Sequence, residues 1–375
     1  MMTVMSPDSH QSIHLERKKT KPNQRMKMKV LFAFLLVFCG CANAFQRAFG
    51  RSVTHKSSLV RATSTTILYA SQDAKSVNIQ LDNIKNMRDI ASSSVTSIKP
   101  GIIYRTGCVS KASDNDIQLC NNLKVKTWID LRSEAELHED ENLHSNKVYN
   151  DFKSFTYDKK FGQFKPLDKD TKLSHSDKRR YFISLMSESL IKKGVFFRLQ
   201  KRLRFKSIFL LMLANISRRA EKRVRSIFIE SINKGGLGLL NELVLDYSSK
   251  EIIEVLKLLT NIDNHPVGVF CTAGKDRTGL ITMLTLSVLG VPDDEILADY
   301  VLSDSAYSEI NDKKAMVASL KQVDVDPEIF LRAKPQVMKD TIAYIRNNFG
   351  SINNYLDAYG FDENWRNKLR IALHL

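Results

Sequence analysis

Apolar runs of two different periods alternate along the chain from Ser76 to the C-terminus. Short runs rich in β-branched residues predict strands over 102–105, 126–131 and 267–271. Longer stretches with an apolar helical face predict helices, over 113–123, 248–259, 278–289, 293–303 and 333–347. This alternation favours an α/β sandwich in which helices flank a central sheet.

One segment connects a predicted strand directly to a predicted helix. Cys271-Thr-Ala-Gly-Lys-Asp-Arg277-Thr-Gly279, the signature segment (residues 271–279), is followed by an apolar helix that stops at Gly290. A helix start directs free N–H groups and the positive end of its dipole at one point, which predicts an anion site. Gly274 permits the curl of the backbone and Gly279 permits close helix packing.

The residue types of this segment fit nucleophilic attack on a phosphoryl group. The helix dipole and Arg277 favour the nucleophilic thiolate of Cys271. Arg277 presents a planar fork that matches two phosphate oxygens, and Asp276 is a candidate acid/base or orienting group. The other members are predicted to bind substrate: Thr272, Ala273, Gly274, Lys275 as a positive charge at the rim, Thr278 as a donor to the leaving thiolate, and Gly279. We expect no metal ion and no cofactor.

The signature segment resembles that of the protein tyrosine phosphatase superfamily, and more narrowly that of the tyrosine/serine phosphatase family of bacteria, fungi, plants and algae. Further segments resemble motifs of that family and occur in its order: Asn86-Met-Arg88-Asp89, Pro100-Gly-Ile-Ile-Tyr-Arg105, Trp128-Ile-Asp130-Leu-Arg132-Ser-Glu-Ala-Glu136, Asp299-Tyr300-Val-Leu-Ser303 and Phe349-Gly350-Ser-Ile-Asn-Asn-Tyr355. The resemblance therefore covers roughly residues 76–375.

The resemblance implies a tyrosine phosphatase-like α/β fold with a central mixed sheet. It also implies hydrolysis of phosphomonoesters through a phosphocysteine, with phosphotyrosine, phosphoserine/threonine or phosphoinositide substrates. One position departs from the family, which usually has His directly before the cysteine, where this chain has Phe270. That departure leaves a second hypothesis open, a catalytically weak pseudophosphatase that acts as a binding module for phosphorylated ligands.

The general acid has more than one candidate. If the sheet is ordered as in the resembled family, Asp130 ends a strand beside the signature segment and is the leading candidate, with Asp276 second. The alternative is that Asp130 forms a salt bridge with Arg132 or Arg105. Asp158 is a third candidate for the acid, from a loop.

Positive charge is concentrated in two segments. The chain has 375 residues and a formal net charge of +16. Residues 1–72 carry +9 and residues 190–226 carry +11, so the remainder sums to −4. The 190–226 segment has an apolar middle between basic flanks, which predicts a helical basic insert within the domain. It is either a lid packed on the domain or an element that binds an anionic membrane surface, and its phenylalanines make a nucleic-acid partner unexpected.

The N-terminal region has the composition of targeting sequences. Residues 1–45 comprise an N-terminal extension and a signal peptide, with an apolar run too short to span a bilayer. Residues 46–75 are rich in Ser/Thr and Arg, like a transit peptide or a disordered linker, and residues 76–375 form the predicted catalytic domain. The two-part pattern predicts import into a secondary plastid, whose reducing interior suits a thiolate; a secretory or endomembrane lumen is the alternative.

Overall fold

A seven-stranded mixed sheet lies at the centre of the structure, a computed structural model that describes residues 79–93, 98–143, 147–167, 176–186, 188–214, 216–307, 317 and 324–374. The strand order is β1-β2-β7-β3-β6-β4-β5. The five inner strands run parallel, and β1 and β5 pair antiparallel at the two edges. The strands are β1 (Arg88–Asp89), β2 (Ile103–Thr106), β3 (Thr127–Asp130), β4 (Lys153–Asp158), β5 (Gln163–Pro166), β6 (Arg179–Phe182) and β7 (Val267–Phe270). This arrangement confirms the predicted mixed sheet.

Helices cover both faces of the sheet. The helices are α2 (Asp114–Asn122), α3 (Glu134–His138), α4 (Glu188–Arg198), α5 (Lys201–Leu213), α6 (Arg218–Tyr247), α7 (Ser249–Thr260), α8 (Asp276–Val288), α9 (Asp293–Val301), α11 (Pro327–Phe330), α12 (Pro335–Phe349), α13 (Ile352–Ala358) and α14 (Glu363–Leu373). Short 3₁₀ segments lie at Ile90–Ser93, Lys147–Tyr149, Ile262–Asn264 and Leu302–Tyr307. The helices expected over 113–123 and 248–259 correspond closely to α2 and α7, and Ser113 caps α2 in a capping box with Asp116.

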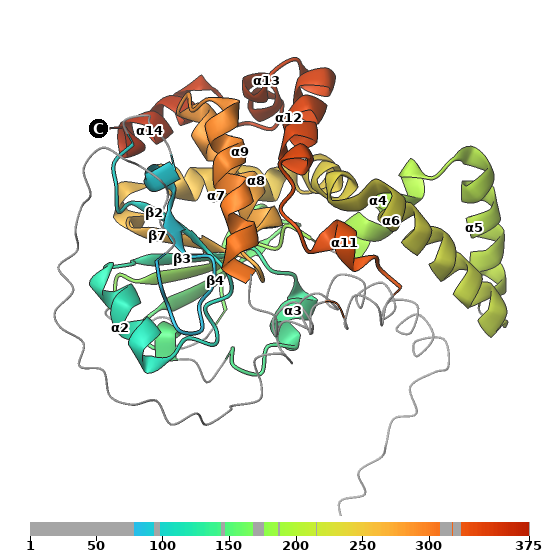
Figure 1. Cartoon of the computed structure of the whole chain (residues 1–375), viewed down its shortest axis with the longest axis horizontal. Coiled ribbons are helices and arrows are strands. Elements are labelled where there is room, and N and C mark those ends of the chain that lie inside the picture. The colour runs from blue at the N-terminus through green and yellow to red at the C-terminus, as the bar shows by residue number, and fades with distance from the viewer. Residues whose placement is uncertain are drawn as a thin grey trace, which may run out of the picture.

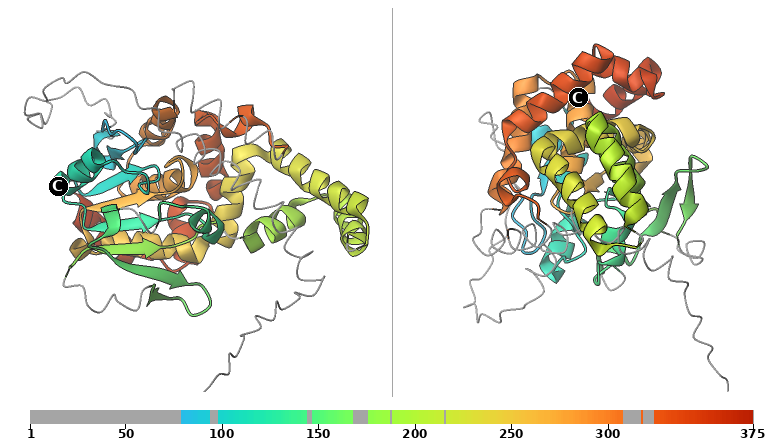
Figure 2. Two further views of the ribbon diagram at one scale, coloured as in Figure 1. Left: turned by 90° about the horizontal axis from the view of Figure 1, so that it is seen from below. Right: turned by 90° about the vertical axis from the view of Figure 1, so that its right-hand side faces the viewer.

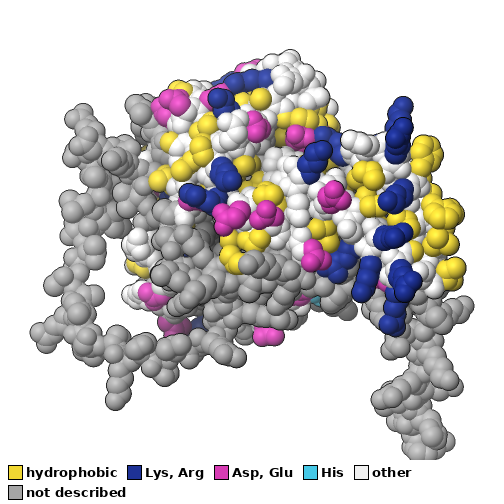
Figure 3. All heavy atoms as spheres, turned by 45° about the vertical axis from the view of Figure 1, so that its right-hand side comes forward, with side chains coloured by type: hydrophobic (Ala, Val, Ile, Leu, Met, Phe, Trp, Pro, Cys, Tyr) yellow, Lys and Arg dark blue, Asp and Glu magenta, His cyan; other side chains and the backbone are white. Residues whose placement is uncertain are grey.

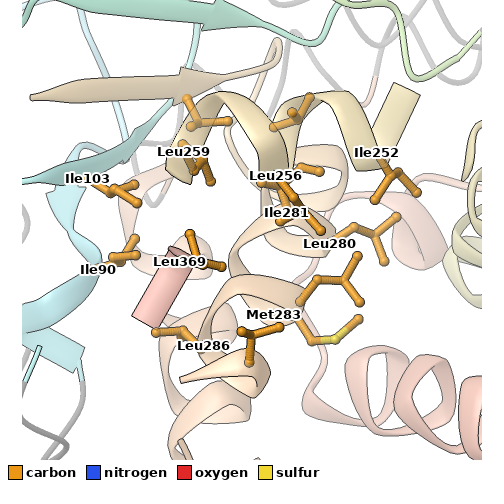
Figure 4. Packing of buried hydrophobic residues seen from close by; sticks show 14 of the residues in the cluster. Ile90, Ile103, Ile252, Leu256, Leu259, Leu280, Ile281, Met283, Leu286 and Leu369 are labelled. Carbon is orange, nitrogen blue, oxygen red and sulfur yellow. The ribbon is translucent and has the colours of Figure 1, made fainter. Parts of the chain in front are cut away.

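Alternation of side chains along the strands divides the core into two parts. Ile103, Ile129 and Val269 point to one face, where they join a large cluster with residues of α7, α8 and α14. Figure 4 shows this packing, with Leu256 of α7 and Ile281 of α8 among the labelled residues. Neighbouring positions such as Trp128 and Phe270 point to the other face and pack in a second cluster with residues of α2.

The residues of the predicted basic insert, 190–226, lie in α4, α5 and the first part of α6. Figures 1 and 2 show α5 and the first half of α6 as a hairpin that projects from the body of the domain. A third hydrophobic cluster lies within it, and Gly236, with a positive φ of 57°, bends α6 where it returns to the body. Within the described residues, no helix combines the length and apolar character needed to cross a bilayer. The predicted extension and signal peptide (1–45) and the transit-like segment (46–75) lie outside the described residues.

Candidate active site

The signature segment lies where the parallel strands end at one edge of the sheet. β7 runs between β2 and β3, so Cys271 follows the central strand of the three. The chain after β2 contacts the segment, where Cys108 N donates to Thr272 O at 3.0 Å. The chain after β3 contacts the last residue of β7, where Leu131 N donates to Phe270 O at 2.8 Å. Ligands of α/β sheets bind at such carboxyl ends, so the topology supports a ligand site at this position.

Side chains from outside the segment hold its carbonyl groups. Asn86 Nδ2 donates to the carbonyls of Ala273 and Gly274 at 3.0 Å each, and Arg105 Nη2 donates to that of Gly274 at 2.8 Å. Because each peptide is planar, the N–H that follows a held carbonyl points the opposite way. The backbone therefore presents N–H groups away from Asn86 and Arg105, as an anion cradle requires.

Gly274 is required at the point where the segment curls. Its φ of +64° lies in the left-handed region, and a Cβ there would lie 2.2 Å from Thr106 O. Gly279, at the start of α8, faces α9, where a Cβ would lie 3.2 Å from Tyr300 Cδ2. Both glycines therefore have the geometric roles that the sequence predicted.

A buried network of ion pairs orients Arg105, which holds the Gly274 carbonyl. Asp299 of α9 accepts from Arg88 Nε at 2.8 Å and pairs with Arg105 through its second oxygen. Burial raises the pKa of the Asp299 carboxyl, but the charges of Arg105 and Arg88 outweigh burial and lower it overall. Ser303 Oγ, one helical turn beyond Asp299, accepts from both arginines. One carboxylate thus orients the arginine that holds the Gly274 carbonyl.

Five residues separate Cys271 from Arg277 along the segment, and Arg277 is paired with Glu136. Cys271 is buried, with 2% of its surface exposed. Arg277 Nη1 and Nη2 donate to the two Glu136 oxygens at 2.6 and 2.7 Å. The two terminal nitrogens therefore face a carboxylate, and the predicted contact of Arg277 with phosphate oxygens stays a prediction. The ion pair with Glu136 fixes the orientation of the Arg277 guanidinium.

Glu136 is expected to make stability depend on acidic pH. Burial raises the pKa of Glu136, but Arg277 and hydrogen bonds from Thr272 and Ser133 outweigh it and lower the pKa to about 2, from 4.5 in the unfolded chain. Because the pKa is lower in the folded protein, ionised Glu136 contributes roughly 3 kcal/mol to the free energy of unfolding. This contribution is fully present above about pH 4.5 and is lost as the pH falls towards 2. Glu136→Gln should therefore lower the free energy of unfolding by about that much at pH 7.

Urea unfolding of wild type and Glu136→Gln at neutral pH and near pH 3.5 measures this effect. The difference between the two proteins should shrink at the lower pH. Glu134→Gln is the matched control, because Glu134 lies on the same short helix with its side chain exposed. Equal stabilities of wild type and Glu136→Gln at pH 7 would contradict the prediction.

Asp276 is the predicted acid/base residue that lies nearest to solvent. It is the first residue of α8, and its side chain is 30% exposed. Tyr300 Oη donates to Asp276 Oδ1 at 3.0 Å. Burial, together with the charge of Asp276, raises the pKa of Tyr300, which keeps that phenol protonated as a donor. Tyr300 thus holds one oxygen of the Asp276 carboxylate, and the Lys275 ammonium lies 3.8 Å from the other.

Lys275, which the sequence predicted as a positive charge at the rim, is buried. Its Nζ donates to the carbonyls of Phe330 at 2.8 Å and Arg332 at 3.4 Å. These carbonyls belong to the end of α11 and the chain that follows, which cover the lysine. The ammonium therefore faces two backbone carbonyls and, at 3.8 Å, the carboxylate of Asp276.

Asp130 lies in a buried salt bridge. Both of its oxygens accept from Arg132 Nε, and Oδ2 also pairs with Arg132 Nη2 at 2.8 Å and Arg180 at 3.2 Å. These contacts favour the alternative of a salt bridge with Arg132 over a role as general acid. Asp158, the third candidate, ends β4 near the far edge of the sheet, where Lys165 pairs with it at 2.6 Å.

The remaining members of the segment differ in what their side chains contact. Thr272 Oγ1 donates to Glu136, so its hydroxyl supports the Arg277 pair. The Thr278 hydroxyl is buried and has no hydrogen-bond partner among the described residues, which leaves its proton available to an acceptor in the site. Ala273 contributes its carbonyl to Asn86.

Phe270 occupies the position of the family histidine as part of the apolar core. It is fully buried, meets Trp128 edge-on and lies 5.5 Å below the Arg132 guanidinium. His265, at the other end of β7, hydrogen-bonds the Leu259 carbonyl at 2.9 Å. No imidazole therefore neighbours Cys271 along this strand, and packing takes the place of a polar contact.

Sequence reasoning did not assign roles to Glu136, Asn86 or Asp299. Glu136 had a local signal, because Ser133-x-x-Glu136 is a capping box and the structure contains both of its hydrogen bonds. The cysteines Cys108, Cys120 and Cys271 are free. No group of three or more side chains suited to a metal ion occurs in the described part of the chain.

Comparison with known proteins concerns the family of the chain. The profile described as "Tyrosine phosphatase family" matches residues 79–374. A protein of Cupriavidus necator named as a tyrosine-protein phosphatase is 35% identical over 96 residues, 24% of this chain and 34% of that protein. The triple specificity protein phosphatase PtpB of Mycobacterium tuberculosis is 27% identical over 120 residues, 29% of this chain and 44% of that protein. A tyrosine-protein phosphatase of Nostoc commune is 39% identical over 59 residues, 16% of this chain and 20% of that protein. The matched stretches thus cover less than half of each relative.

Proposed function

The chain belongs to the tyrosine phosphatase family, and we propose that it is a cysteine-dependent phosphatase that hydrolyses phosphomonoesters through a phosphocysteine. One observation supports this above the others: Asn86 and Arg105 hold the carbonyls of residues 273 and 274, so that N–H groups face the opposite side. Cys271 and Arg277 belong to the same segment, with five residues between them. An anion bound by those N–H groups is placed for attack by the cysteine.

In the first step the Cys271 thiolate attacks phosphorus. The Sγ–P bond forms as the P–O bond to the leaving alcohol breaks, and a protonated Asp276 gives its proton to the leaving oxygen. Arg277 and the backbone N–H groups stabilise the charge on the phosphoryl oxygens. Asp276 suits the role of acid because its side chain reaches solvent, whereas Asp130 is fully buried between two arginines.

In the second step water attacks the phosphocysteine. The Asp276 carboxylate accepts a proton from water, the O–P bond forms, and the Sγ–P bond breaks to release phosphate and the thiolate. The Thr278 hydroxyl, which has no partner in the described residues, is the proposed donor to the departing sulfur. The substrate class that we propose is phosphotyrosine, phosphoserine or phosphothreonine of proteins, or a phosphoinositide.

The second candidate is a binding module that retains phosphorylated ligands without turnover. Phe270 motivates it, because a phenylalanine cannot hydrogen-bond the nucleophile loop as a histidine can. Hydrolysis of p-nitrophenyl phosphate by the wild-type chain distinguishes the two. A phosphatase is expected to release phosphate. Acid quench during turnover should also trap a phosphoryl group on Cys271, which mass spectrometry locates. Binding of a phosphotyrosine peptide without any release would refute it and support the module.

A further inference from the structure

The outer face of α5 carries a stripe of exposed apolar side chains. Phe205, Phe209 and Met212 are 73%, 58% and 63% exposed, and Ile208 beside them is also exposed. Their spacing of four and three residues places them on one face of the helix. The opposite face of α5 is already used, since Ser207, Leu210 and Ala214 are buried against the hairpin interior. The exposed apolar side chains therefore lie opposite the face that packs in the hairpin, and they do not contribute to that packing.

Basic side chains surround this stripe. Those exposed on α5 and at the start of α6 are Lys201, Arg202, Lys206, Arg218, Arg219, Lys222 and Arg223. No described carboxylate forms an ion pair with any of the seven, and Glu221 is the single acidic residue between positions 201 and 225. Figure 3 shows a column of Lys and Arg side chains next to hydrophobic side chains at the outer edge of this part of the molecule.

We propose that this hairpin surface, the outer face of α5 with its flanking basic residues, docks the protein on an anionic lipid bilayer. An interfacial helix buries an apolar face between the acyl chains and the headgroups, while its basic side chains remain at the level of the anionic phosphates. At 13 residues α5 is about 20 Å long, so it lies in the plane of the interface and does not span it.

Charge separates the bilayer from other occupants of the stripe. The N-terminal 72 residues of this chain carry +9 and would be repelled by the hairpin. A second copy of the same face would bring seven positive side chains against seven more. An anionic bilayer can bury the apolar stripe and also attract the basic side chains. The N-terminal segment or a second copy of the hairpin could bury the stripe but would repel the basic side chains.

Docking does not require the hairpin to rearrange. Val224 and Phe228 of α6 pack with Phe330 of α11 in one cluster, which joins the hairpin to the chain that covers Lys275. The inner face of α5 packs in that cluster, and the side chains of the outer stripe belong to none of the clusters formed by the described residues. The stripe is therefore presented to the surroundings in the folded state.

The test places a fluorophore within the stripe of the full-length protein. In Phe209→Trp, emission of the new indole should shift to the blue and be quenched by acyl-chain-brominated lipid when phosphatidylcholine vesicles contain phosphatidylserine. Subtraction of the wild-type signal removes Trp128 and Trp365. An unchanged indole spectrum overturns the proposal even if the protein cosediments with vesicles through its basic N-terminal segment. An equal shift with pure phosphatidylcholine overturns the electrostatic part.

Matched variants separate the two contributions. Lys201→Gln/Arg202→Gln/Lys206→Gln should weaken vesicle binding of the Phe209→Trp protein by about fivefold per charge. The control Lys250→Gln/Lys334→Gln/Lys339→Gln removes the same charge from exposed positions elsewhere and should leave binding unchanged. If the control variant lost as much vesicle binding as the hairpin variant, the docking surface would not be local to the hairpin.

The apolar stripe is tested in the same way. Phe205→Ser/Met212→Ser should lower partitioning of the Phe209→Trp protein by more than about tenfold, whereas Ile371→Ser, which changes a side chain that is 76% exposed on α14, should not. A blue shift that grows with protein concentration without vesicles, together with a dimer in sedimentation equilibrium, overturns the proposal in favour of self-association. All outcomes are independent of whether the chain turns over p-nitrophenyl phosphate.

Discussion

Cys271→Ser is expected to lower kcat for p-nitrophenyl phosphate by at least about 10⁴-fold, because it removes the covalent nucleophile while the rest of the site remains. A serine hydroxyl is not ionised near neutral pH, and Phe270 offers no base to ionise it. The exchange of sulfur for oxygen is nearly isosteric at this buried position, so the fold should be retained. The expected result is thus a folded protein without turnover.

Binding distinguishes loss of the nucleophile from loss of the site. The Cys271→Ser protein should still bind inorganic phosphate in calorimetry, because the N–H groups of the segment and the Arg277–Glu136 pair are unchanged. Cys108→Ser is the matched control: its Sγ contacts Arg132 and Ser110, which a hydroxyl can also do, and it should keep most of the turnover. Full activity of Cys271→Ser would show that the nucleophile lies elsewhere.

Local signals explain what the sequence could predict. The strand before Cys271, the helix that starts at Asp276 and the curl at Gly274 all depend on residues within a few positions of one another. The same is true of the Ser113 cap. Such features follow from hydrophobic period, capping and the freedom of glycine, which are properties of short segments. The order of the sheet followed from a resemblance and not from these signals.

Long-range contacts explain what the sequence could not predict. Lys275 is a charged residue in a loop, and nothing near it indicates that the Phe330 carbonyl, 55 residues later, will cover its ammonium. For Asp130 the sequence left two roles open, general acid or salt bridge with Arg132, and it gave no sign of the second partner, Arg180, which lies 50 residues away. A single sequence does not identify distant partners of this kind, on which the burial of a charged group depends.

Substitution of Asp299 is expected to lower both stability and activity, although Asp299 lies outside the signature segment. Asp299→Asn keeps the shape of the side chain but removes the negative charge between Arg88 and Arg105, which are both fully buried. Two buried guanidinium groups without a counter-charge should cost about 3–5 kcal/mol of unfolding free energy. Activity should also fall, because Arg105 loses the partner that directs its Nη2 to the Gly274 carbonyl.

A matched substitution on the same helix separates this effect from the loss of any aspartate. Asp293, at the start of α9, pairs with Arg346 through both oxygens, at 2.6 and 3.0 Å, but both side chains are about half exposed. Asp293→Asn should therefore cost at most about 1 kcal/mol in urea unfolding and leave turnover unchanged. Asp293 pairs with one exposed arginine and Asp299 with two buried ones, so the comparison measures what the buried pair of arginines adds. If Asp299→Asn were as stable and as active as Asp293→Asn, the cradle would be held by the backbone of the signature segment alone, and Arg88 and Arg105 would not be needed to orient it.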